Sequence, residues 1–214
     1  MALGSAIRRL LGPRLSRVAA RWYRAIFVDL DKVADALAAV IPRDSHLLDV
    51  GGGDGEVLNH LLTRRPDVRV TTLDTAATVG RWLFSRFEAQ VHRLPATSLA
   101  EYLGSGRSDP QVVLFADVMH HIPSASRADV LGCLSALLDR VTGLKIIVKD
   151  LEPGSWRARL GYWSDRYVTG DRNVRFISRE DLVRLSEKEL GPLRHEETGL
   201  FEQDAPNYAI VFYR

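Results

Sequence analysis

The stretch LLDVGGGDG, from Leu47 to Gly55, combines acids and glycines in a pattern that suits ligand binding. An apolar run leads into it and a helical pattern follows, so the glycines occupy a turn between a strand and a helix. Glycine permits a positive φ there and lets a ligand touch the backbone, while the helix N-terminus offers unpaired N–H groups. Asp74, which ends the next β-rich run, suits ribose hydroxyls. The pattern predicts a site for a nucleoside-containing cofactor; a tight turn without a ligand is the less favoured alternative.

Two histidines are candidates for proton transfer. His120 and His121 closely follow Asp117, which comes directly after the apolar run VVLFA. Imidazole titrates near neutral pH, so either ring is a candidate general base for a hydroxyl nucleophile. We favour His121 slightly, because a proline closes the loop behind it. The alternatives are that both histidines only hold the loop, or that Lys149 or Asp150 in the run LKIIVKD acts instead.

The elements that must position these residues alternate between short β-rich runs and helical patterns. This alternation predicts an α/β fold, a parallel sheet with helices on both faces. The expected strands cover 46–50, 68–73, 91–94, 112–116 and 144–150, followed by an antiparallel hairpin of 195–201 and 208–213. The expected helices cover 56–65, 79–90, 98–103, 126–138 and 178–190, the last opened by Ser178 as its cap.

The first 28 residues contain no acid and six arginines, which are Arg8, Arg9, Arg14, Arg17, Arg21 and Arg24. Apolar residues recur every three or four positions over 18–40, which predicts one long amphipathic helix. We expect this helix to pack on the domain that follows; contact with a membrane surface and a targeting role for the first dozen residues are the alternatives. The chain thus divides into a basic helical segment, 1–41, and a domain, 42–214, with an irregular insertion at 151–176.

Composition narrows the remaining classes of protein. Hydrophobic residues make up 46% of the chain and charged residues 26%, which is typical of a globular protein. A single cysteine, Cys133, rules out an internal disulfide framework, and no Cys or His grouping has zinc-ligand spacing, so we expect no metal. No apolar run approaches the roughly 18 residues that cross a bilayer. We therefore expect a cytoplasmic protein, with a peripheral position at a membrane as the alternative.

Several of these motifs occur together in one known family. LLDVGGGDG, TLD at 72–74, VVLFADVMHHIP, LKIIVKD and the final hairpin appear in an order that resembles the class I, Rossmann-like S-adenosylmethionine-dependent methyltransferases. The resemblance covers residues 42–214. It implies a seven-stranded, mostly parallel Rossmann-like sheet with a C-terminal antiparallel hairpin, here preceded by an extra N-terminal helix. It also implies S-adenosyl-L-methionine as the cofactor and S-adenosyl-L-homocysteine as its product.

The resemblance assigns residues to the cofactor, and these are Asp49, Gly51, Gly53, Gly55, Asp74, Asp117 and Val118. Asp74 would accept hydrogen bonds from both ribose hydroxyls, Asp117 would lie beside the methionine part, and Val118 would form the wall next to the sulfonium. The family usually has a Gly-Asp pair after the third strand for the adenine amino group, where this chain has Ala96 and Thr97. We therefore expect backbone groups and apolar contacts around the adenine.

The aromatic and arginine-rich stretch after residue 151 resembles the insertion that caps the substrate pocket in this family. The expected substrate-binding residues are Trp156, Tyr162, Trp163 and Arg166. Aromatic walls with arginine suit a small aromatic or anionic molecule. The alternative is that the rings only fill the join between the cap and the core.

These observations favour methyl transfer to a small organic metabolite, with O-methylation in a biosynthetic pathway as the preferred reaction. One alternative is a lipid or polyprenyl-type substrate at a membrane surface, and another is a non-catalytic module that binds the cofactor or its product and regulates a partner. Nucleic acid is disfavoured, because residues 117–120 lack the Asn/Asp-Pro-Pro-Tyr turn of amino-group methyltransferases and no long basic run lies between residue 42 and LKIIVKD. The sequence leaves the oligomeric state open.

Overall fold

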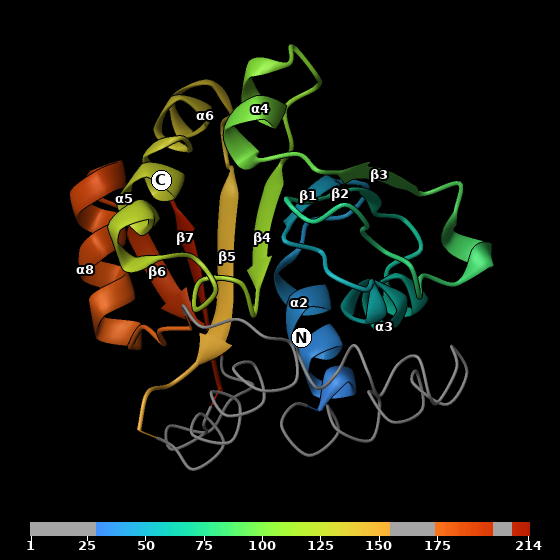
Figure 1. Ribbon diagram of the computed structural model, residues 1–214, viewed down its shortest axis with the longest axis horizontal. Helices are drawn as coiled ribbons and strands as arrows, with labels where there is room; N and C mark the ends of the chain where they lie inside the picture. Colours follow the sequence, from blue (N-terminus) through green and yellow to red (C-terminus); the bar gives the residue numbers. More distant parts are fainter. Residues whose placement is uncertain (1–28, 155–173, 199–206) are drawn as a thin grey trace.

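The computed structural model describes residues 29–154, 174–198 and 207–214 (Figure 1). Within them, seven strands form one sheet in the order β3-β2-β1-β4-β5-β7-β6. The strands are β1 (His46–Val50), β2 (Arg69–Asp74), β3 (Val91–Pro95), β4 (Val112–Ala116), β5 (Lys145–Leu151), β6 (Arg194–Glu197) and β7 (Asn207–Tyr213). The helices are α2 (Leu30–Val40), α3 (Glu56–Arg64), α4 (Leu99–Gly104), α5 (Arg127–Gly132), α6 (Ser135–Arg140) and α8 (Arg179–Leu190), with 3-10 turns η1 (Ser85–Phe87) and η2 (Ser124–Ser126).

The strand order creates a binding crevice at one edge of the sheet. β1 pairs in parallel with β2 on one side and with β4 on the other, and β3 and β5 extend the sheet in parallel. β7 is antiparallel to both β5 and β6. The predicted seven-stranded sheet with its C-terminal hairpin is therefore confirmed. In such sheets ligands bind at the carboxyl ends of the strands where the order reverses, which is here between β1 and β4.

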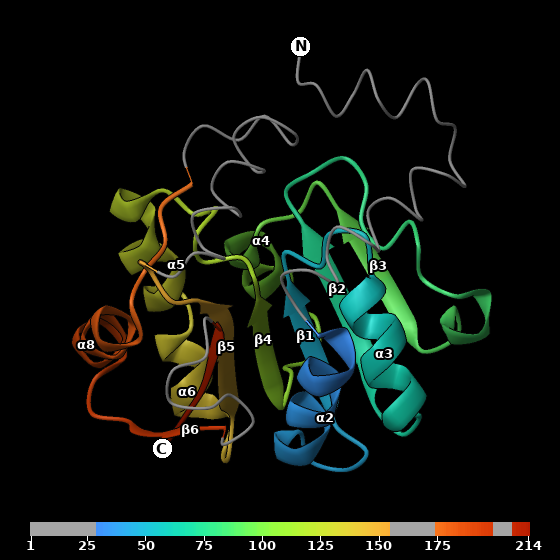
Figure 2. The same cartoon turned by 90° about the horizontal axis from the view of Figure 1, so that it is seen from below.

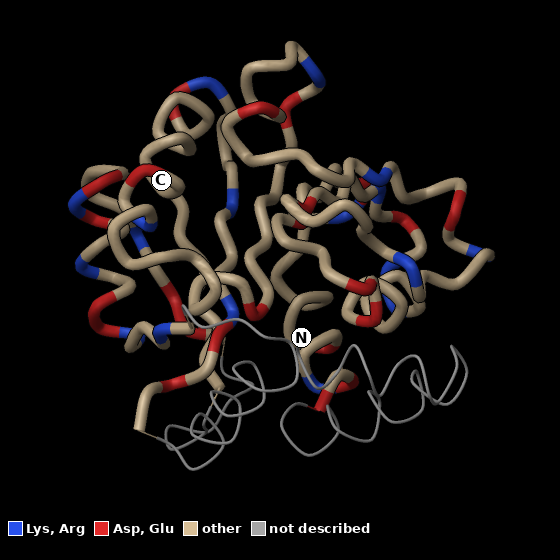
Figure 3. The backbone as a smooth tube through the Cα atoms, viewed as in Figure 1, with Lys and Arg blue, Asp and Glu red and all other residues tan. Residues whose placement is uncertain are grey.

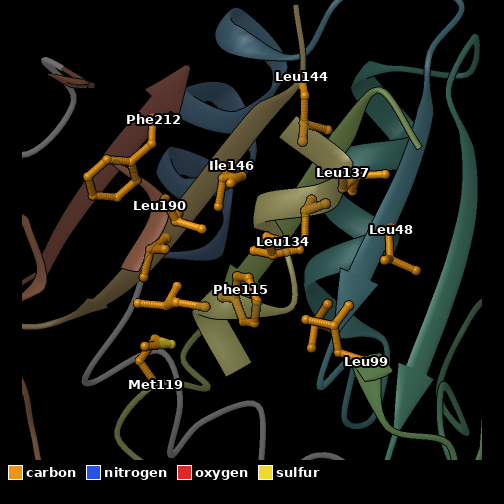
Figure 4. Close-up of a cluster of buried hydrophobic side chains, with 14 of the residues drawn as sticks. Leu48, Leu99, Phe115, Met119, Leu134, Leu137, Leu144, Ile146, Leu190 and Phe212 are labelled. Atoms are coloured by element: carbon orange, nitrogen blue, oxygen red, sulfur yellow. The ribbon is translucent and has the colours of Figure 1, made fainter. Parts of the chain in front are cut away.

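Helices cover both faces of the sheet (Figure 2). α2 and α3 lie on one face, whereas α5, α6 and α8 lie on the other. Successive strand residues point to opposite faces, so Leu47 belongs to the core beneath α2 and α3, while Leu48 belongs to the second core. Figure 4 shows this second core, in which Phe115 and Ile146 of the sheet pack with Leu137 of α6. The two cores hold the sheet between its helices and fix where its edge lies.

α2 begins at Leu30 and does not continue an earlier helix. Asp29 has an extended backbone, with φ −77° and ψ 98°, and its side chain accepts hydrogen bonds from N–H groups in the first turn. This N-cap marks the start of the helix, so the prediction of one unbroken helix over 18–40 is wrong. Residues 1–28 lie outside the described part of the chain. The expected packing of α2 is confirmed, because its apolar side chains are buried beside α3.

Acidic and basic positions are intermixed over the described backbone (Figure 3). Between α2 and α3, Arg64 pairs with Asp31 at 2.9 Å and also with Asp35, and His60 Nδ1 lies 3.0 Å from Asp31. Both carboxylates are well exposed, so these pairs contribute little to stability. The apolar stripe of α2 therefore supplies most of its docking free energy.

The predicted helix over 79–90 is wrong. The structure has only the short turn η1 there, because neighbouring segments bind the backbone groups that a helix would pair internally. The N–H of Gly80 donates to the glycine turn after β1 at 2.8 Å. The side chain of Asn59 donates to the carbonyl of Trp82 at 2.9 Å and accepts from the N–H of Phe84 at 2.7 Å. The segment therefore follows the glycine turn and α3.

The predicted helix over 126–138 is divided into α5 and α6. The N–H of Leu134 donates to the carbonyl of Leu131, which is one residue closer than the partner it would have in an α-helix. The turn that this bond closes contains Gly132, a residue of low helix propensity. The last predicted helix is confirmed as α8, and the Ser178 side chain caps it.

Replacing Asn59 tests how the segment over 79–90 is held. Asn59→Ala removes a buried side chain and deprives the Trp82 carbonyl and the Phe84 N–H of one partner each. We expect the free energy of unfolding to fall by about 1 to 3 kcal/mol, measured by urea denaturation, because two part-buried hydrogen bonds, each worth about 0.5 to 1.5 kcal/mol, are lost. Ser85→Ala, a polar change at an exposed position of the same segment, is the control. Equal effects of the two changes would contradict this account.

Candidate active site

A cavity of about 690 Å³ opens at the crevice between β1 and β4. Its walls come from the turn after β1, the end of β2 and the loop after β4. Five of the predicted cofactor-binding residues line it, and these are Gly51, Gly53, Asp74, Asp117 and Val118. Both candidate histidines line it as well. The structure thus gathers residues from three strand ends around one space.

The glycine turn is held between β2 and β4. Gly51 has φ +72°, and its N–H donates to the carbonyl of Leu73 at 2.8 Å. A Cβ on Gly51 would lie 2.6 Å from a methyl carbon of Val118. Gly53 has φ +53°, and a Cβ there would meet no atom closer than 3.9 Å, so this position faces open space. Gly51 is thus required by packing, whereas Gly53 presents backbone to the cavity.

Two predicted cofactor residues, Asp49 and Gly55, lie beneath the turn and do not line the cavity. Asp49 is 3% exposed and accepts a hydrogen bond from the Thr72 hydroxyl at 2.8 Å. Gly55 has φ +88°, and a Cβ on it would lie 3.1 Å from Cα of Gly80. Gly52 is equally constrained, since its Cβ would fall 1.8 Å from the Thr72 oxygen. The prediction named only the alternating glycines and left out Gly52. The unbroken run of three glycines was the sign in the sequence that Gly52 is also constrained.

Asp74 ends β2 with its carboxylate held in place. One oxygen accepts from the N–H of Ala76 at 2.8 Å, and the other accepts from the N–H of Gly53 at 3.1 Å. The same bond to Gly53 connects the carboxylate to the glycine turn. A fixed acceptor at this position can bind a diol, as the sequence predicted for ribose hydroxyls.

β4 ends in a corner formed by Asp117. Its φ of +57° is an uncommon backbone conformation for a residue other than glycine. The Asp117 N–H donates to the carbonyl of Lys149 at 2.8 Å, and Oδ1 of Asp117 lies 2.5 Å from Lys149 Nζ. Lys149 itself does not line the cavity, so it is placed behind the wall and not against a substrate. The corner directs Val118 onto the glycine turn.

His120 has a buried carboxylate partner. Nδ1 of His120 lies 2.6 Å from Oδ1 of Asp150, and the His120 N–H donates to Oδ2 of Asp150 at 3.1 Å. Asp150 is fully buried, and the ring of Phe176 lies 5.0 Å from that of His120. His121 is exposed, and its ring centroid lies 4.2 Å from that of His120. The geometry of an oriented base therefore favours His120.

Arg127 holds the histidine loop from behind. Its Nε donates to the carbonyls of Met119 and Ile122, both at 3.1 Å, and its Nη2 donates to the carbonyl of Arg175. Burial lowers the pKa of this guanidinium, and the nearby Asp150 charge opposes that effect. The sequence does not reveal this role of Arg127, since one arginine at the start of a helix gives no signal that separates it from a surface charge.

The end of the cavity beside β2 and β3 is formed by Leu73, Thr75, Ser98 and Leu99. Ser98 caps α4: its hydroxyl accepts from the Glu101 N–H at 3.2 Å and donates to the Glu101 carboxylate at 2.7 Å. Ala96 has φ +51°, and neither it nor Thr97 lines the cavity. This end therefore presents leucine side chains together with hydroxyls.

The predicted substrate-binding residues Trp156, Tyr162, Trp163 and Arg166 lie outside the described residues. Over 29–154, 174–198 and 207–214, no group of three or more His, Cys, Asp or Glu side chains is placed to hold a metal ion. In the same ranges no helix has the length and apolar character needed to cross a membrane. The described wall on the histidine side also includes Ile122, Pro123, Val130 and Leu151.

Sequence comparison identifies one family. A sequence profile described as a methyltransferase domain matches residues 20–189, which is most of the chain. No curated protein sequence matches the chain.

Three solved structures share the fold. A SAM-dependent methyltransferase from Archaeoglobus fulgidus has a TM-score of 0.65 at 16% identity, over 91% of this chain and 99% of that one. Human N-acetylserotonin methyltransferase in complex with SAM has a TM-score of 0.64 at 18% identity, over 98% of this chain and 58% of that one. An O-methyltransferase family 2 protein from Planctomyces limnophilus in complex with apigenin has a TM-score of 0.62 at 16% identity, over 85% of this chain and 57% of that one. The chain spans little more than half the length of the last two, and at these identities the likeness concerns the fold alone.

Asp49→Asn tests the cost of the carboxylate beneath the glycine turn. Burial, with a smaller effect of the Asp74 charge, raises the pKa of Asp49 to about 6, compared with about 3.9 in an unfolded chain. The native protein therefore holds this proton more tightly than the unfolded chain, and ionising Asp49 costs stability as the pH rises through this range. We expect the stability of Asp49→Asn relative to wild type to increase by about 2 kcal/mol from about pH 4 to about pH 7. Urea denaturation across this range measures it, and a difference independent of pH would contradict the expectation.

Proposed function

The chain belongs to the S-adenosylmethionine-dependent methyltransferase family, and from this premise we propose that it methylates a hydroxyl oxygen of a small organic molecule in a biosynthetic pathway. The observation that carries the proposal is the buried pair of His120 and Asp150 at the cofactor cavity. A neutral hydroxyl is a weak nucleophile and needs a base to remove its proton. An imidazole oriented by a carboxylate is such a base.

The cavity fits a nucleoside that carries an amino acid group. Its volume of about 690 Å³ lies within the range of small-molecule pockets. We propose that Asp74 accepts the ribose hydroxyls, that Gly51 and Gly53 present backbone to the cofactor, and that Asp117 and Val118 contact its methionine part. Asp49 and Gly55 support the turn from beneath in this proposal. When bound, S-adenosylmethionine supplies a methyl group already activated on a sulfonium.

Asp150 sets the tautomer of His120 in the proposed mechanism. The Nδ1–H of His120 donates to Oδ1 of Asp150, with Nδ1 and Oδ1 2.6 Å apart, so Nε2 carries the lone pair. Nε2 of His120 would take the O–H proton of the acceptor and so make its oxygen a better nucleophile toward the methyl group that the bound cofactor would supply. The charge of Asp150 then stabilises the imidazolium. Arg127 keeps the backbone on either side of His120 in place through the two carbonyls that it binds.

Two of the solved structures support a small organic acceptor, since one is N-acetylserotonin methyltransferase and the other is an O-methyltransferase with apigenin. We propose that Trp156, Tyr162, Trp163 and Arg166 contact an aromatic or anionic acceptor, on the strength of their residue types in the sequence. The same proposal places the activity in the cytoplasm.

Substitution of the histidines separates their roles. We expect His120→Asn to lower kcat for O-methylation at least about 100-fold, because general base catalysis contributes about that much or more. The Kd for S-adenosylmethionine should change less than about threefold, since the base does not bind the cofactor. His121→Asn, in the same loop, is the matched control and should keep kcat within about fivefold.

The assay supplies S-adenosylmethionine with phenolic and indolic acceptors, including apigenin and N-acetylserotonin, in a wider acceptor screen. Release of S-adenosylhomocysteine gives the rate, and mass spectrometry of the product locates the methyl group. Transfer to nitrogen or carbon only, or a loss of kcat in His121→Asn with none in His120→Asn, would contradict the proposal.

A further inference from the structure

Lys149 is a buried cation with a defined contact at the active-site corner. It lies near the end of β5, its side chain is 1% exposed, and Nζ lies 2.5 Å from Oδ1 of Asp117. Burying an ammonium costs several kcal/mol unless a partner offsets the loss of hydration. The Asp117 side chain is 32% exposed and lines the cavity. The pair therefore joins a residue behind the wall to a residue in the wall.

The backbone at this corner is strained and is held by the same lysine residue. Ala116 is the register partner of Lys149, and the chain turns directly after it into Asp117, whose φ is +57°. Such a conformation costs about 1 to 3 kcal/mol and persists where surrounding contacts determine it. Lys149 supplies two such contacts, its carbonyl to the Asp117 N–H and its Nζ to the Asp117 carboxylate. Lys149 thereby restrains both the backbone and the side chain of Asp117.

The order of the strands decides which end of the cofactor meets Asp117. In the proposed function Asp74 on β2 accepts the ribose hydroxyls, and His120 after β4 marks the reacting end. The glycine turn on β1 lies between these points. A nucleoside whose ribose is at β2 and whose sulfonium is near His120 must extend its amino acid group along the β4 side, toward Asp117. An ammonium there would complement this carboxylate.

We propose that Lys149 is a positioning residue for the amino acid group of the cofactor: it holds the Asp117 carboxylate in the orientation that receives the cofactor's ammonium. Lys149 acts through Asp117, because Lys149 does not line the cavity. The inference rests on the proposed function, because it uses the cofactor assignment and takes His120 as the mark of the reacting end.

Two ligands that differ only at the relevant end test this role by calorimetric titration. S-Adenosylhomocysteine carries the amino acid group, whereas 5′-methylthioadenosine has the same nucleoside and thioether without it. We expect Lys149→Met to raise the Kd for S-adenosylhomocysteine at least about tenfold and to leave that for 5′-methylthioadenosine within about twofold. If Lys149 had only a structural role, its replacement would lower the affinity for both ligands equally.

The matched control is Lys145→Met on the same strand. Lys145 is half-buried at the opposite end of β5, and its Nζ donates to the carbonyl of Val40 at 2.8 Å. Neither ligand should lose affinity in this variant. Asp117→Asn serves as a second variant at a more exposed position and should show the same selective loss. In the double variant Asp117→Asn/Lys149→Met, affinity for S-adenosylhomocysteine should be no weaker than in Asp117→Asn alone.

Additive losses in the double variant, equal weakening of both ligands, or unchanged affinity in Lys149→Met would each overturn the proposal. Wild-type protein that bound neither ligand would overturn this proposal and the cofactor assignment together. A selective loss of S-adenosylhomocysteine in a protein that methylates nitrogen or carbon would support Lys149 and contradict only the O-methylation proposal.

Discussion

The close approach of backbone segments at the end of β1 is the constraint on which the site depends. The turn from Gly51 to Gly55 bonds to β2, contacts Val118 after β4 and meets the segment at Gly80, all within five residues. A Cβ at Gly51, Gly52 or Gly55 would lie 3.1 Å or less from a neighbouring atom. Because these contacts fix the turn, they also fix the N–H of Gly53 that holds Asp74. One tightly packed turn thus sets the distance between the ends of β2 and β4.

Charged groups gather behind the cavity wall. Asp49, Arg127, Lys149 and Asp150 are all buried there. Each buried charge costs free energy unless partners offset it. In return, three of them bind parts of the wall: Lys149 binds Asp117, Asp150 binds His120, and Arg127 binds the backbone of the histidine loop. Part of the stability of the fold is therefore used to orient groups in the cavity, a pattern more typical of functional sites than of cores.

Sequence patterns predicted those parts of the molecule in which local residue types determine the structure. β4 and β5 were clear because strands covered on both faces are rich in apolar residues, and the glycine turn was clear because positive φ favours glycine. The helix expected over 79–90 failed because Asn59, a residue of α3, binds that backbone. The pairings of Lys149 with Asp117 and of Arg127 with carbonyl groups join residues distant in sequence or depend on a loop's shape. No spacing rule could reveal them.

We expect this cavity to bind S-adenosylmethionine through the carboxylate of Asp74, and calorimetric titration of the full chain measures that binding. Saturable binding at one site per chain is expected, and Asp74→Ala should weaken it at least about tenfold, which corresponds to about 1.4 kcal/mol. Thermal unfolding of the variant without ligand checks that the change acts on binding and not on folding. Absence of binding by the wild-type chain, or equal affinity in Asp74→Ala, would contradict the account.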